Sequence, residues 1–243
     1  MHLNYDIERK NMNIIEFKKI EDIQQSIVHF IKIEVTDLGT TLEEILKVLA
    51  DLSWLNKFDE EFMQNSFKTK AQRTINALIE LFKNDKDSNI VSETGEYIVS
   101  ELSREGIIDK LGYLDIPLIE LLEKKQKGNP GFDFITENQG SEIIIFGEAK
   151  YSSSTNAYGK ALDQINKFIS NSKDIDELSN MNNFCSKASL INANNGIKGF
   201  AAAFSVTDIN TDILINNIKN NNDFKKLLKY KEIVLVGVCI KIQ

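Results

Sequence analysis

The chain is predicted to fold as an α/β protein, with a mixed central sheet flanked by helices and a helical part before it. Apolar runs of strand length occur at residues 142–150, 199–206 and 233–240, and segments with the spacing of amphipathic helices separate them. Both side-chain faces of the 142–150 run are apolar through its middle, which is typical of an inner strand covered on both sides. Strands that alternate with helices favour a sheet with helices packed on its faces.

The N-terminal part is expected to be helical from about residue 20 to residue 82. One apolar stripe at helix spacing follows Thr40 or Thr41 as the N-cap, and a second stripe ends near residue 82. The members of the stripes are Leu42, Ile45, Leu46, Leu49 and Leu52, and then Ile75, Leu78, Ile79 and Phe82. The polar stretch 84–89 makes the best boundary. We therefore expect a helical region over residues 1–86 and a second domain over residues 87–243.

The second domain is expected to start with a helix over residues 92–104. Segment 117–125 fits a first strand or a helix, and Gly140 supplies the turn of a hairpin between the next two strands. The later elements are strands near 131–137 and 142–150, a helix at about 156–170, a loop with a short helix at 171–195, a strand at 199–206, a helix at 211–228 and a strand at 233–240.

The helix at 92–104 is expected to carry one carboxylate toward the sheet. Its apolar side includes Gly95, which lets the helix approach closely, and Glu96 lies beside that side. Glu96 therefore either faces a sheet edge or is a solvated helix carboxylate. Three charged residues are expected further out from that side: Glu93, Glu101 and Arg104. Of these, Glu93 is expected to lie in water.

The most informative residues are Asp133, Glu148 and Lys150, at the ends of the two hairpin strands. Because side chains alternate along a strand, Glu148 and Lys150 project from one face where the apolar run ends. Phe132 and Phe134 are expected to share a face, with Asp133 pointing away from them and toward Glu148. Buried acids and a buried lysine are costly unless they are paired or metal-bound, and two carboxylates with water ligands suit Mg²⁺.

An acid-x-Lys triplet alone is a weak signal, because the chain also contains Glu16-Phe17-Lys18, where solvated charges are expected. The apolar strand before Glu148, the aspartate on a partner strand and the helix that follows distinguish the triplet at 148–150. The alternative is a strand that ends in a surface Glu and Lys, with Asp133 in an ordinary turn.

Asp133 and Glu148-Ala149-Lys150 resemble the signature of the PD-(D/E)xK nuclease superfamily, although Phe132 stands where that signature has proline. Residues 93–165 resemble more narrowly the nuclease subunit of Hachiman antiphage systems (the HamA family). That likeness is carried by Gly95-Glu96, Gly131-Phe132-Asp133 and Gly147-Glu148-Ala149-Lys150. The resemblance implies a restriction-endonuclease-like core over residues 87–243 and a nuclease of antiphage defence or restriction. It also implies that Glu96 supports the metal or a second water.

The expected chemistry is Mg²⁺-dependent hydrolysis of nucleic-acid phosphodiester bonds, with Mn²⁺ able to substitute. Asp133 and Glu148 would hold the metal, together with the carbonyl of Ala149, and Lys150 would orient water or stabilise the phosphate. A cation would lower the pKa of Lys150 and the carboxylates would raise it, so its role as a base stays open. The alternative function is a non-catalytic nuclease-fold subunit of a defence or repair complex.

Composition limits the partners. A net charge of −7 argues against a general electrostatic grip on nucleic acid. Basic stretches at 68–73 and 124–127 fit solvated surfaces as well as binding sites. We expect DNA as the substrate before RNA, a protein partner such as a helicase, a homodimer as one assembly, no membrane and a cytoplasmic location. Cys185 and Cys239 are expected to be buried free thiols.

Overall fold

The computed structural model describes residues 12–20, 25–84, 92–122, 131–207 and 209–240. Within these ranges six strands form one mixed sheet in the order β1-β2-β6-β5-β4-β3. The four inner strands run parallel, and the edge strands β1 and β3 pair antiparallel with their neighbours. The strands are β1 (Met12–Ile20), β2 (Ile27–Val35), β3 (Phe134–Asn138), β4 (Ile143–Lys150), β5 (Gly199–Ser205) and β6 (Glu232–Ile240).

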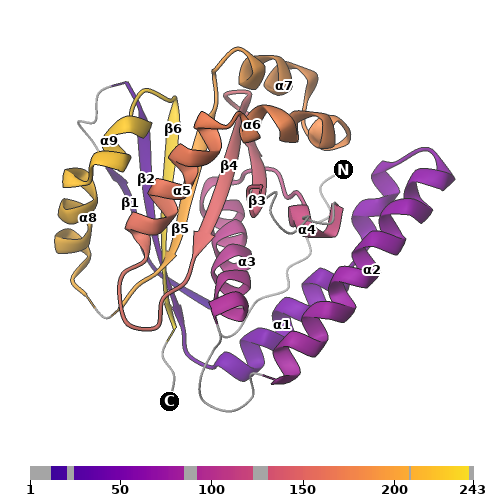
Figure 1. Ribbon diagram of the computed structural model, residues 1–243, viewed down its shortest axis with the longest axis horizontal. Coiled ribbons are helices and arrows are strands. Elements are labelled where there is room, and N and C mark those ends of the chain that lie inside the picture. The colour runs from indigo at the N-terminus through magenta and orange to yellow at the C-terminus, as the bar shows by residue number, and fades with distance from the viewer. Residues whose placement is uncertain (1–11, 21–24, 85–91, 123–130, 208, 241–243) are drawn as a thin grey trace.

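Helices cover both faces of the sheet, which confirms the predicted α/β class (Figure 1). The helices are α1 (Leu38–Ala50), α2 (Glu61–Asn84), α3 (Ser92–Leu111), α4 (Ile119–Leu122), α5 (Tyr158–Ser170), α6 (Lys173–Asp176), α7 (Lys187–Asn194), α8 (Thr211–Asn220) and α9 (Asn222–Leu227), with 3-10 turns η1 (Ser53–Lys57) and η2 (Glu177–Asn183). In Figure 1, α5 lies in front of the sheet, α8 and α9 lie at its left, α3 lies behind it, and α1 and α2 form a hairpin at the lower right.

Two hydrophobic clusters occupy the two faces, and β4 contributes to both in alternation. Ile144 and Phe146 pack on the side of α5, whereas Ile145 and Ala149 pack on the side of α3. This confirms that β4 is an inner strand covered on both sides. The hairpin of β3 and β4 and the strands β5 and β6 also lie where the sequence placed them.

The expected helical start of the N-terminal part is wrong, because residues 12–20 and 27–35 form strands. Val28 and Phe30 enter one cluster and Ile31 and Ile33 enter the other, so β2 is an inner strand like β4. It pairs along its whole length with β6, so the sheet draws on both sides of the boundary expected near residue 86. The polar stretch that suggested this boundary lies, from residue 85 on, outside the described residues.

The helices α1 and α2 confirm the rest of the N-terminal expectation. The N-cap of α1 is Asp37, however, whose Oδ1 accepts from the Thr40 N–H at 2.9 Å. Segment 119–122 is the short helix α4 and not a strand. The expected loop at 171–195 is mostly short helices, and the expected helix at 211–228 divides at Asn221, which caps α9.

Candidate functional site

A cleft of about 340 Å³ opens beside the carboxyl end of β4 and holds all four predicted site residues. Strand β3 begins at Phe134, opposite Gly147, so Glu148 and Lys150 lie on β4 beyond the start of β3. Helices α3 and α5 supply the flanking walls. The cleft is lined by Glu93, Glu96, Tyr97, Ser100, Gly131, Asp133, Glu148, Lys150, Gln164 and Phe168.

Asp133 is fixed to β4 at two points. Its N–H donates to the Gly147 carbonyl at 2.8 Å, and its Oδ2 accepts from the Ala149 N–H at 2.7 Å. These contacts hold its carboxyl group beside the Glu148 segment. Phe132 and Phe134 do not share a face as expected, because Asp133 precedes the regular strand; Phe132 packs on the α5 side and Phe134 on the α3 side.

Lys150 forms the electrostatic centre of the cleft. Its Nζ lies 2.7 Å from Glu148 Oε1 and 3.5 Å from Glu96 Oε2, and it donates to the Ala149 carbonyl at 3.0 Å. Burial would lower the pKa of Lys150, but the Glu148 and Asp133 carboxylates outweigh it and raise the pKa above its ordinary 10.5. Lys150 is therefore an ammonium group at neutral pH. Glu148, only 2 % exposed, is a buried carboxylate with this cation beside it.

Glu96 reaches the cleft from α3, as its place beside the apolar side of the helix predicted. Burial raises the pKa of Glu96 and Asp133 adds to this rise, while Lys150 and the main-chain N–H of Tyr151 oppose it. Gly95 permits a close approach, as expected, but its neighbour is the ring of Tyr151, directly after Glu148-Ala149-Lys150. The contact of Gly95 with Tyr151 thus sets how closely the start of α3 approaches the end of β4.

Further cleft residues did not stand out in the sequence. Glu93 is exposed, as predicted, yet it also lines the cleft, as do Tyr97 and Ser100. These residues and Glu96 are three or four positions apart and so share one side of α3. That spacing is the signal that could have revealed this wall of the cleft. Gln164 and Phe168 line the cleft from α5.

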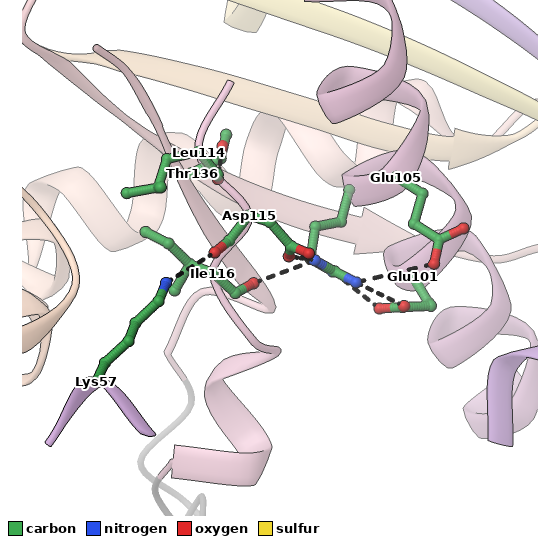
Figure 2. Close-up of polar contacts among 8 residues, drawn as sticks. Lys57, Glu101, Glu105, Leu114, Asp115, Ile116 and Thr136 are labelled. Carbon is green, nitrogen blue, oxygen red and sulfur yellow. Dashed lines mark hydrogen bonds and ion pairs between the residues drawn. The ribbon is translucent and has the colours of Figure 1, made fainter. Parts of the chain in front are cut away.

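The C-terminal half of α3 is fixed by a buried ion-pair cluster around Arg104, whose partners Glu101, Asp115 and Ile116 are labelled in Figure 2. The Arg104 guanidinium donates twice to Glu101, at 2.7 and 3.0 Å, and also to the Asp115 carboxylate and to the Ile116 carbonyl. Burial works against its charge, but the carboxylates outweigh this and raise the pKa of Arg104. The prediction that Glu101 and Arg104 lie further out is wrong, because segment 114–116 covers that side of the helix.

Segment 114–116 also joins the edge of β3. The Leu114 N–H donates to the Glu137 carbonyl at 2.9 Å, and Thr136 Oγ1 donates to the Leu114 carbonyl at 2.7 Å (Figure 2). The helix that carries Glu96 is therefore linked through Arg104 and this segment to the strand that follows Asp133. The same contacts therefore fix both α3, which is one wall of the cleft, and β3, which directly follows Asp133.

The donor set of the cleft suits a hard divalent cation. Asp133, Glu148 and Glu96 offer carboxylate oxygens and Ala149 offers its carbonyl oxygen. Glu148, Glu96 and the Ala149 carbonyl already contact the ammonium of Lys150. Among the described residues, no group of three or more His, Cys, Asp or Glu side chains could hold a metal ion as it stands. The fit therefore rests on two carboxylates with a main-chain carbonyl and water, a set that Mg²⁺ commonly accepts.

Other sequence expectations lie outside the cleft. The basic stretch at 68–73 is on α2 and does not line it, and residues 124–127 fall outside the described residues. Cys185 and Cys239 are buried and form no disulfide bond, as expected. None of the helices in the described ranges is long and apolar enough to cross a membrane. Comparison with family models and with curated proteins gave no match to this chain.

Proposed function

We propose that this protein is a Mg²⁺-dependent nuclease that hydrolyses phosphodiester bonds, with DNA as the first substrate to test and antiphage defence or restriction as its role. The proposal is supported above all by the convergence of Asp133, Glu148 and Lys150 on one cleft at the end of an inner strand. Buried charges of this kind are costly to the fold, and they cluster where chemistry needs them.

Asp133 and Glu148 would hold the metal, with the Ala149 carbonyl beside them. The bound ion would supply Lewis acidity and an acidified water. Asp133 keeps its position through its two bonds to β4, so this ligand is pre-organised. Lys150, charged at neutral pH, would stabilise the negative phosphoryl oxygens and is a poor general base in this state.

Glu96 is suited to a second role at the cleft. Its raised pKa makes it a better proton acceptor than an ordinary carboxylate, and it is more exposed than Glu148. It can therefore hold a cleft water by hydrogen bonding and accept a proton from it.

The non-catalytic alternative is favoured by one observation: Lys150 and Glu148 already neutralise each other.

The test is a cleavage panel of single- and double-stranded DNA and RNA with Mg²⁺, Mn²⁺ or EDTA. The variants Asp133→Asn, Glu148→Gln and Lys150→Met keep side-chain size, and the asparagine keeps an oxygen that can accept from Ala149. Each should lower the rate by about a hundredfold or more, and combined losses should not add. The side chain of Lys167 on α5 is 60 % exposed, and Lys167→Met is the charge-matched control. Full activity in Asp133→Asn, or no activity in the wild type either alone or purified with its partner, would overturn the proposal.

A protein partner such as a helicase would give this acidic protein access to nucleic acid. Purification with and without the partner, followed by the same panel, distinguishes a nuclease that needs delivery of its substrate from an inactive subunit. Sedimentation of the isolated chain tests the homodimer.

A further inference from the structure

The ammonium of Lys150 lies where the proposed metal ligands converge. It contacts Glu148 Oε1 and the Ala149 carbonyl at 2.7 and 3.0 Å, and Glu96 Oε2 at 3.5 Å. Glu148 and the Ala149 carbonyl are the same oxygen donors that the proposed function assigns to Mg²⁺. The lysine is therefore the resident counter-ion of this oxygen set in the structure.

This arrangement has a clear physical reason. Glu148 is 2 % exposed, and a carboxylate at that depth is costly without a positive charge beside it. The Lys150 side chain is 21 % exposed. Its ammonium stands at the end of a flexible four-carbon chain, so the ammonium can move away without unfolding the strand. A divalent ion on the same oxygens would repel the ammonium strongly at a few ångströms.

We infer that Lys150 competes with the divalent cation for Glu148 and the Ala149 carbonyl, so that binding of the cation displaces the ammonium and frees it for the substrate phosphate. This inference rests on the proposed function. It makes the lysine a regulator of metal affinity as well as a group that acts on the phosphate. Because a phosphate offers the displaced ammonium a new partner, substrate and cation should bind with positive coupling, which is reciprocal.

The test is Mn²⁺ binding, measured by calorimetry and by the loss of the free Mn²⁺ electron paramagnetic resonance signal. Lys150→Met removes the charge and should tighten Mn²⁺ binding by about tenfold, the effect of one charge removed from a partly buried site. Lys150→Arg keeps the charge, and Lys167→Met removes a charge from the exposed face of α5. Both should stay within about twofold of the wild type, because neither removes the competing charge.

The outcomes separate the inference from the function on which it rests. Equal or weaker Mn²⁺ binding by Lys150→Met, with clear binding by the wild type, would overturn the competition and leave the metal site intact. Absence of Mn²⁺ binding by wild type and Lys150→Met alike would overturn both. Binding that Glu148→Gln does not weaken would move the metal away from Glu148 and refute the competition there.

A measurement on the wild type covers the case in which Lys150→Met does not fold. Brief treatment with an acylating reagent, followed by peptide mass spectrometry, reports how accessible each lysine amine is. Ca²⁺ should raise modification of Lys150 several-fold relative to Lys167, because the displaced ammonium loses its buried contacts. Unchanged or lower modification of Lys150 at saturating Ca²⁺ would refute the displacement.

Discussion

Arg104→Met should destabilise the fold far more than loss of any exposed ion pair. The guanidinium side chain is 5 % exposed and Glu101 is fully buried, so the substitution leaves a carboxylate in the core without the two bonds that it accepts from Arg104. Removing one partner of a buried pair costs about 3–5 kcal/mol. For a chain of this length that corresponds to a fall in the thermal midpoint of roughly 6–20 °C.

The assay is urea unfolding followed by circular dichroism, with the thermal midpoint as a second measure. Lys83→Met is the control, because it removes an exposed pair with Glu80 and should cost less than about 1 kcal/mol. The double variant Glu101→Met with Arg104→Met should recover most of the loss, since apolar residues of similar size often replace a buried pair at little cost. Arg104→Met as stable as the control, or a double variant no better than the single one, would refute the reasoning.

Three further predictions concern the cleft and the opposite end of the sheet. Glu96→Gln should lower cleavage at low Mg²⁺ and recover at high Mg²⁺ or Mn²⁺, with a smaller effect from the exposed Glu93→Gln; equal, negligible effects would remove Glu96 from the site. Gly95→Ala would place its Cβ 2.3 Å from the Tyr151 ring and should cost about 1–3 kcal/mol and much of the activity, whereas Gly159→Ala on α5, with its nearest atom at 4.0 Å, should be tolerated; equal behaviour of the two would contradict the contact. Burial lowers the pKa of His29 in the folded state. The contribution of His29 to stability is therefore present above about pH 6.5 and is lost as pH falls through the folded-state pKa. Urea midpoints at pH 7.5 and 5.5 should differ less in His29→Phe than in the wild type.

The sequence located the elements whose signals are local. The strand that ends at Lys150 is apolar on both faces, and the turn at Gly140 is marked by its own residues, so both could be predicted. Strand β2 could not, because a short apolar run fits a buried helix as well as a buried strand. Pairing with β6, about two hundred residues later, decides between them. A pattern within residues 27–35 carries no information about that partner.

The site was predictable for a related reason, and its surroundings were not. Alternation along β4 places Glu148 and Lys150 together without knowledge of the rest of the fold. Helix phase placed Glu96 near the sheet but put Arg104 further out, because phase alone does not show which distant segment covers a polar side. The prediction that Phe132 and Phe134 share a face was wrong for a similar reason. Side-chain alternation holds only within a regular strand, and Phe132 precedes the start of β3.

Under the proposed function, the charge of the cleft decides how an acidic protein would bind a polyanion. Glu93, Glu96, Asp133 and Glu148 line the cleft against the single ammonium of Lys150. Without a divalent ion this surface repels phosphate, and a chain with net charge −7 offers no compensating field. Under the proposed function, the bound cation offsets most of the negative charge of the cleft and frees the ammonium of Lys150 at the same step. Binding of nucleic acid should then follow the divalent concentration, in contrast to proteins that bind through a basic surface and weaken steeply with monovalent salt. The excess of carboxylates would then make substrate binding conditional on the metal, so that the cleft holds nucleic acid only when it is also able to cut it.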